Sequence, residues 1–160
     1  MDEFAKLDFK PLIANAIGEV FQKMLSLEAG VMAGGPQEGD IEDRIVGSVG
    51  FAGKVMGKVN IHLSDAFARV IAASMLGIEL EEIEGQEEVD DVVSELSNMI
   101  GGQLKTHIAG TGLSCELSLP SITRGSNFEI EAKGWARHEK IGFSHQQHRA
   151  LAELYIKSSE

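Results

Sequence analysis

Two carboxylates and one carboxamide recur between residues 91 and 102 at a spacing that places them on one side of a helix. At about 100° per residue, Glu95 lies about +40° and Asn98 about −20° from Asp91. Gly102 falls at about +20°, inside the same narrow stripe. A carboxylate can pair with a cation, and a neutral carboxamide offers both hydrogen-bond donors and an acceptor. This stripe is therefore the stretch of sequence best equipped for chemistry.

The opposite side of the same segment is apolar. Its core-facing positions are Val89, Val93, Leu96, Ile100 and Leu104. This periodicity predicts a long helix over residues 86–109 with the polar stripe facing outward. Gly101 and Gly102 lie inside it, each costing about 1 kcal/mol relative to alanine, which indicates a close approach at this point. On spacing alone, an ordinary solvated face is the commoner explanation of such a stripe.

The order of residues in this helix adds a resemblance to a known family. Asp91-x-x-x-Glu95-x-x-Asn98, followed by Met-Ile-Gly-Gly, is similar to the signature of the CheX/CheC/FliY chemotaxis phosphatases, and it is closest to CheX. That signature continues to a proline in the next segment. Here Pro120 follows after 21 intervening residues, one fewer than is usual in the family. The resemblance extends in outline over the whole chain, including the first helix around Asn15–Leu25 and a glycine-rich hairpin.

The resemblance implies that the chain hydrolyses the aspartyl phosphate of a CheY-type response regulator in two-component signalling. Asn98 would position the attacking water. Glu95 would pair with the lysine beside the regulator's phosphate and so set the depth of Asn98. Asp91, Gly102 and Pro120 would contact the partner. Mg²⁺ would be held by the regulator's own acids, so no metal or other cofactor is expected on this chain.

Several alternatives stay open beside this interpretation. One is a non-catalytic adaptor or flagellar-switch domain that binds a receiver domain without turnover, and another is a receiver other than CheY. Glu19 and Gln22, with Asn15 in the leading position, nearly match the active motif, so a second site competes with an ordinary surface pair. The resemblance also implies a homodimer joined through edge strands, for which residues 149–156 are a candidate.

Other chemistry-bearing residues have simpler explanations. His138, His145 and His148 lie close together in the sequence, but we expect surface histidines rather than a metal site. The glycines of residues 47–54 superficially match a phosphate loop, yet Val55 stands where that loop requires Ser or Thr. Cys115 is better explained as a small core residue than as a nucleophile.

Composition narrows the class of partner and the compartment. The 160 residues carry a formal net charge of −11, which disfavours nucleic acids and anionic membrane surfaces. Cys115 is the only cysteine, so no internal disulfide can form. The acidic N-terminus is unlike a secretory signal, and no apolar run reaches the roughly 18 residues that a membrane span needs. We therefore expect a cytoplasmic protein built as one domain over residues 1–160.

The elements that must position the stripe follow from the remaining patterns. Residues 12–25 predict an amphipathic helix, 29–45 a glycine-rich loop, 45–63 a β-hairpin, and 65–75 a helix capped by Ser64 or Asp65. Residues 79–91 hold eight acids, which we interpret as a solvated helix entrance rather than a metal site. Four strands are predicted at 113–119, 127–132, 136–143 and 149–156. The fold class is α+β (mixed α/β) and CheC-like, with helices packed on a mainly antiparallel sheet and a duplicated helix-plus-hairpin unit near 11–63 and 86–143.

Overall fold

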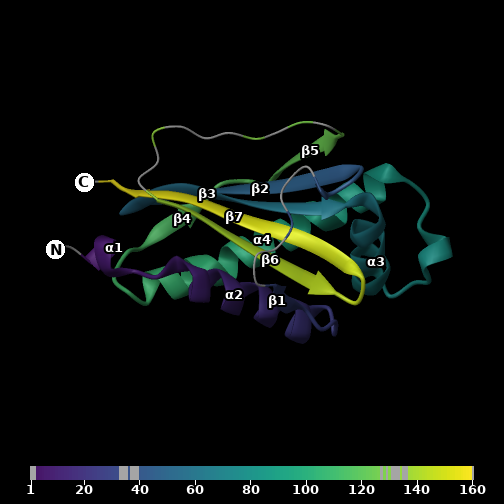
Figure 1. Cartoon of the computed structure of the whole chain (residues 1–160), viewed down its shortest axis with the longest axis horizontal. Helices are drawn as coiled ribbons and strands as arrows, with labels where there is room; N and C mark the ends of the chain where they lie inside the picture. The colour runs from purple at the N-terminus through teal and green to yellow at the C-terminus, as the bar shows by residue number, and fades with distance from the viewer. Residues whose placement is uncertain are drawn as a thin grey trace.

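A computed structural model describes residues 3–32, 36, 40–126, 128, 130, 134 and 137–159. It contains one antiparallel sheet with helices packed against one of its faces (Figure 1). The helical elements are α1 (Glu3–Lys6), α2 (Phe9–Glu19), π-helical η1 (Val20–Met24), α3 (Asp65–Leu76), 3₁₀-helical η3 (Leu80–Glu82) and α4 (Gln86–Ala109). The strands are β1 (Gly30–Met32), β2 (Arg44–Gly53), β3 (Val55–Ser64), β4 (Cys115–Leu117), β5 (Ser121–Gly125), β6 (Arg137–His145) and β7 (His148–Ser158). The predicted α+β class is confirmed.

The sheet is assembled from two hairpins that meet at its centre. Its strand order is β1-β6-β7-β3-β2-β4, and β5 also pairs with β2. Hairpin β2–β3 follows the helical segment α2–η1, and hairpin β6–β7 comes after α4 and the edge strands, so a helix and a hairpin occur twice. The second strands of the two hairpins pair with each other, with Ile61 opposite Ala152. The second hairpin therefore ends later than residue 143, where we placed it.

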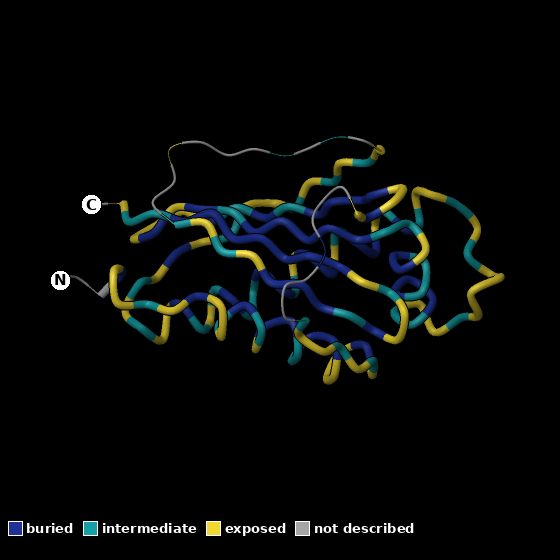
Figure 2. Tube along the Cα trace, in the orientation of Figure 1, coloured by how far each residue is buried: buried dark blue, intermediate teal, exposed yellow. Residues whose placement is uncertain are grey.

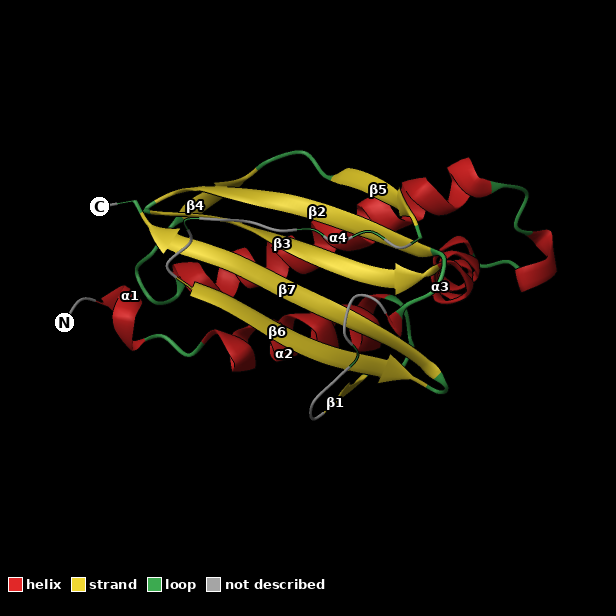
Figure 3. Ribbon diagram, turned by 45° about the horizontal axis from the view of Figure 1, so that its top comes forward, coloured by secondary structure: helices red, strands yellow, loops and turns green. Residues whose placement is uncertain are grey.

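The core lies between the sheet and the helices (Figures 2 and 3). Strand positions alternate, so every second residue of β3, including Val59, Ile61 and Leu63, enters the apolar core. On the helical side, Phe21 and Phe67 are fully buried and pack edge-on or tilted against the ring of Phe143 of β6. These aromatic contacts join η1, α3 and the sheet. Helix α4 packs separately against β2.

Local chemistry explains where the predicted helices begin and end. The Ser64 side chain accepts a hydrogen bond from the Phe67 N–H at 3.1 Å and so caps α3. Gly77 ends that helix with φ of 68°, a left-handed conformation that favours glycine. Helix α4 spans Gln86–Ala109, as the periodicity predicts. Among the described residues no helix is both long and apolar enough to cross a membrane.

Several strand predictions need correction. The expected loop at 29–45 contains β1, which pairs with β6, and the edge strand β5 was missed. The strand predicted at 127–132 falls on residues that lie largely outside the described part of the chain. Residues 149–156 were proposed as a dimerising edge, but β7 is paired on both sides, with β3 and β6. The exposed edges of the described sheet are formed by β1 and by β4 with β5.

Candidate functional site

The polar stripe of α4 faces solvent. Asp91, Glu95 and Asn98 are exposed, and Gly102 is partly exposed. Within the part of the chain that the structure describes, the side chains of Glu95 and Asn98 have no hydrogen-bond or ion-pair partner. Because the two side chains lie about one turn apart on a regular helix, they project together without being held by this chain. Their donors and acceptors are free for another molecule.

The neighbouring face of α4 is packed tightly onto β2. A Cβ at Gly47 would lie 1.9 Å from the Ser97 hydroxyl oxygen, so a side chain there would force Ser97 to move. A Cβ at Gly101 would lie 3.2 Å from a methyl group of Val49. The close approach indicated by the two helical glycines is therefore made by Gly101. At Gly102 an added Cβ would meet nothing within 4 Å, so the packing of this chain does not explain that glycine.

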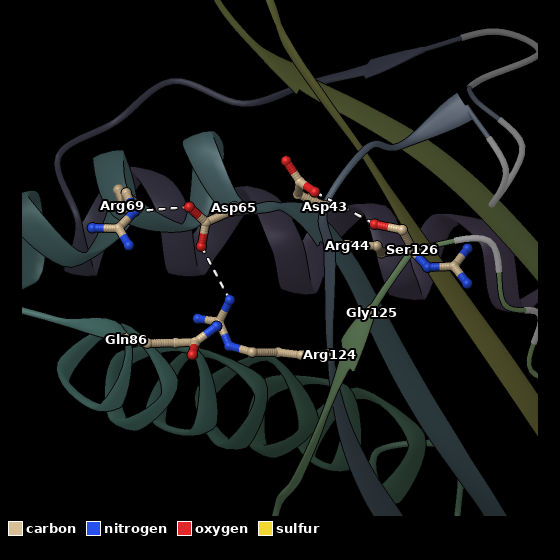
Figure 4. A pocket seen from close by; sticks show the side chains of 8 residues that line it. All are labelled: Asp43, Arg44, Asp65, Arg69, Gln86, Arg124, Gly125 and Ser126. Atoms are coloured by element: carbon tan, nitrogen blue, oxygen red, sulfur yellow. Dashed lines mark hydrogen bonds and ion pairs between the residues drawn. The ribbon is translucent and has the colours of Figure 1, made fainter.

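An arginine clamp holds the N-terminal part of α4. Arg124 of β5 donates from Nε to Asp90 of α4 at 2.6 Å and from Nη1 to Asp65 of α3 at 3.0 Å. Asp65 also accepts from Arg69 at 2.8 Å. Figure 4 shows Asp65, Arg69 and Arg124 at a pocket that Gln86 also lines, and the volume of this pocket is about 350 Å³. Burial alone would raise the pKa of Asp65, but the hydrogen bonds from the two arginines lower it. The clamp therefore ties α3, α4 and β5 together through charges that neutralise one another.

The C-terminal half of α4 is fixed on both flanks. His107 Nε2 lies 2.7 Å from Glu19 of α2, and Lys105 Nζ lies 3.3 Å from Glu116 of β4. Glu19 is thus engaged in a contact between helices. Gln22 lies in the π-helical segment η1, so the pair does not reproduce the α-helical spacing of Glu95 and Asn98. These contacts favour a structural role for Glu19 over a second active motif.

Pro120 lies in the link between β4 and β5, at the sheet edge above α4. Leu117 is opposite Phe51 and Ser121 is opposite Ser48, so three residues of the link face two of β2. The extra residue forms a β-bulge. A proline in a bulge does not have to donate a backbone hydrogen bond to the neighbouring strand. The structure thus brings Pro120 to the edge beside α4, although it shows no hydrogen bond between Pro120 and the stripe.

The other sequence candidates have structural roles. His145 is 9% exposed and its Nδ1 lies 2.7 Å from the Glu28 carbonyl, so the expectation of a surface histidine was wrong there. His148 stacks on Phe67 with ring centroids 5.2 Å apart. Cys115 is buried, and burial raises the pKa of its thiol, which suits a core residue. The described residues contain no group of three or more His, Cys, Asp or Glu side chains placed to hold a metal ion.

A buried polar cluster on the sheet face away from the helices was not predicted. Glu153 of β7 is fully buried and lies 2.8 Å from His62, 2.9 Å from His138 and 3.1 Å from the Tyr155 hydroxyl. Burial alone would raise the pKa of Glu153, but hydrogen bonds from His62, His138 and Asn60 lower it to about 2. The available signal was that Asn60 and His62 alternate with apolar residues in a strand whose residues 59–63 are all buried.

Comparisons with known proteins place this geometry in a family. The family model described as chemotaxis phosphatase CheX matches residues 45–144, a range that contains the whole of α4 and Pro120. No curated protein sequence matches the chain.

Solved structures with this fold also match. The chain is similar to a chemotaxis protein CheX from Vibrio vulnificus, with a TM-score of 0.80 and 24% identity over 94% of this chain and 97% of that one. It is also similar to a CheC-like superfamily protein from a Shewanella species, with a TM-score of 0.80 and 24% identity over 96% of this chain and 99% of that one. A third match is a chain of a CheX–CheY–BeF₃–Mg²⁺ complex from Borrelia burgdorferi, with a TM-score of 0.74 and 22% identity over 96% of this chain and 100% of that one. These likenesses confirm the CheC-like fold.

Proposed function

Because the chain belongs to the chemotaxis phosphatase CheX family, we propose that it hydrolyses the aspartyl phosphate of a CheY-type response regulator. The observation that supports this most strongly is the exposed pair of Glu95 and Asn98, without partners among the described residues, on a helix fixed at both ends. Such a pair can enter a partner's active site without breaking any contact described in this chain. A rigid helix also limits the entropy lost on docking.

Asn98 acts as the group that positions the attacking water. An acyl phosphate is already reactive, and phosphoryl transfer passes through a loose transition state, so alignment of the water is the main requirement. The carboxamide oxygen accepts one hydrogen of the water and directs the water oxygen toward phosphorus. The bond from phosphorus to the regulator's carboxylate then breaks, which releases inorganic phosphate and a free aspartate. A neutral amide suffices because no strong base is needed.

Glu95 acts through its charge. In a receiver active site it pairs with the lysine beside the phosphate and fixes how deeply Asn98 enters. Asp91, one turn earlier, and Pro120, at the sheet edge, contact the receiver around this point. The open side of Gly102 gives the partner's backbone room to approach α4 closely.

Mg²⁺ belongs to the receiver in this proposal. The relative from Borrelia burgdorferi was solved as a CheX–CheY–BeF₃–Mg²⁺ complex, and aspartate oxygens are the ligands that Mg²⁺ prefers. The metal supplies charge neutralisation at the phosphate. This chain contributes the carboxylate of Glu95 and the amide of Asn98 to the opposite side of the same centre. The setting we propose is the cytoplasm, where chemotaxis receivers act.

A homodimer also remains part of the proposal. The edges formed by β1 and by β4 with β5 are open to strand pairing among the described residues, and the second of these borders the α4 stripe. Light scattering of the purified chain measures this directly. A molar mass of one chain at micromolar concentration would contradict it.

Phosphate release from a phosphorylated CheY-type receiver tests the catalytic role. Asn98→Ala is expected to lose at least about a hundredfold in stimulated rate while it still binds the receiver, since it removes a group required in the transition state. Gln147→Ala removes an exposed amide in the turn between β6 and β7; it is the matched control and should keep full activity. Full activity in the Asn98 variant would overturn the mechanism. Receiver binding by the wild type without any acceleration of phosphate loss would support the non-catalytic adaptor instead.

A further inference from the structure

Leu119 stands out on the surface beside the proposed site. It is 90% exposed, and the next most exposed large hydrophobic side chain among the described residues is Val31 at 57%. Single exposed apolar residues are ordinary on protein surfaces. The local backbone, however, explains why Leu119 is exposed.

The bulge in the link interrupts the pattern that would bury Leu119. Cys115 and Leu117 of β4 face the helices, so strict alternation would send Leu119 into the same layer. The extra residue breaks that alternation, and Ile122 takes the inward position opposite Gly47 instead. Bulges at sheet edges commonly re-aim a side chain next to a functional site. Here the result is an apolar side chain that lies outside the core and is almost fully exposed.

The link is also held in place by hydrogen bonds. Ser118 donates its N–H to the Gly50 carbonyl at 2.9 Å, and its hydroxyl accepts from the Gly50 N–H at 2.8 Å. On its other side, Pro120 restricts the backbone and leads directly into β5. Leu119 is therefore presented from an ordered support, so its burial by a partner would cost little backbone entropy.

The link lies beside the turn of α4 that carries Asn98. On the β5 side of the link, Ser97 of α4 contacts Gly47, which pairs with Ile122. On the β4 side, Gly101 of α4 lies near Leu117. Lys105 reaches out to Glu116 of β4, so this flank of α4 points to the same sheet edge. The link that carries Leu119 thus runs alongside the turn of α4 that carries Asn98.

We infer that Leu119 is an apolar anchor that buries against the receiver domain when Glu95 and Asn98 enter its active site. This inference rests on the proposed function and adds a specificity-determining contact to it. The acidic stripe attracts the cationic centre of the receiver, whereas Leu119 selects receivers that carry an apolar surface beside it. A receiver with a charged residue at that place would bind weakly, because the charge would be desolvated without a partner.

Leu119→Ser tests the anchor, with Leu80→Ser, a 47% exposed leucine of η3, as the matched control. We expect KM for the phosphorylated receiver to rise about tenfold with kcat changed less than about twofold, since a buried leucine contributes to binding alike in ground and transition states. Leu119→Met should restore wild-type KM, and Leu80→Ser should leave it unchanged. Urea unfolding of each variant checks that the fold is retained.

Direct binding separates this inference from the catalytic proposal. The probe is a CheY-type receiver loaded with beryllofluoride and Mg²⁺, which mimics the phosphorylated state without being hydrolysed. If the wild type binds this receiver but releases no phosphate, and Leu119→Ser weakens binding about tenfold, the anchor stands while the catalytic proposal fails. If Leu119→Ser binds as the wild type does, the anchor is overturned whatever the phosphatase result.

Discussion

The hydroxyl of Ser97 on α4 occupies the space that a side chain at Gly47 on β2 would need, with 1.9 Å between its oxygen and an added Cβ. This contact sets how close α4 lies to the sheet. It also fixes the rotation of α4, because Ser97 and Asn98 are adjacent in sequence and differ by about 100° around the axis. With Ser97 against β2, Asn98 must project to the exposed side.

Gly47→Ala is therefore expected to destabilise the protein. The new methyl group would clash with Ser97 and crowd Val93 at 3.2 Å, and overpacking of this kind costs about 1–3 kcal/mol. Urea unfolding measures the change. Gly18→Ala on α2, where an added Cβ meets nothing within 4 Å, is the control and should be neutral or slightly stabilising. The double variant Gly47→Ala, Ser97→Ala should recover part of the loss; no recovery would show that Ser97 is not the obstacle.

Removal of the arginine clamp should loosen the N-terminal part of α4. Arg124→Met leaves Asp65 and Asp90 without their shared partner, at an expected cost of about 1–3 kcal/mol of unfolding free energy, because hydrogen bonds to charged groups are lost. Arg149→Met, at an exposed arginine of β7, should change stability by less than about 0.5 kcal/mol. Equal stability of the two variants in urea would contradict the clamp.

The helices were the most predictable part of this fold. In α4 the apolar positions repeat from Val89 to Ile108, over about five turns, and this periodicity predicts the helix that the structure shows at Gln86–Ala109. The outward direction of Asp91, Glu95 and Asn98 follows from the same pattern, because the core face is fully specified without them. The resemblance to CheX then assigned a chemistry to the stripe that spacing could not.

The edge of the sheet was the least predictable part. β1 has three residues and β5 five, and β5 sends only Ile122 toward the core, so their existence depends on the partners β6 and β2. The bulge before Ser121 shifts the inward face by one residue, and a period-two pattern cannot show such a shift. For the same reason the exposure of Leu119 was invisible in the sequence.

The Glu153 cluster predicts a specific dependence of stability on pH. The pKa of Glu153 is about 2 in the folded protein against an ordinary value of 4.5, so the folded state favours the charged form. The corresponding stability, on the order of 3 kcal/mol, is fully present above pH 4.5 and is lost as the pH falls toward 2. Urea unfolding at pH 7 and pH 3 should show this loss in the wild type. Glu153→Gln should be less stable at pH 7 and show a smaller difference between the two pH values; an unchanged difference would contradict the role of Glu153.

Glu95 should contribute to docking through its charge, and the dependence of KM on ionic strength measures this contribution. Raising the ionic strength screens the attraction between Glu95 and a receiver lysine, so KM of the wild type for the phosphorylated receiver should rise with salt. Glu95→Gln keeps the size of the side chain and removes the charge, so we expect a KM about tenfold higher at low salt and a weaker response to added salt. Glu87→Gln, in the exposed first turn of the same helix, controls for the loss of one negative charge and should retain most of the salt response. Each variant removes one negative charge from α4, so both change the long-range electrostatic attraction to the receiver by a similar amount. If both variants lost the salt dependence of KM equally, net charge would explain that dependence, and a direct Glu95–lysine pair would be contradicted.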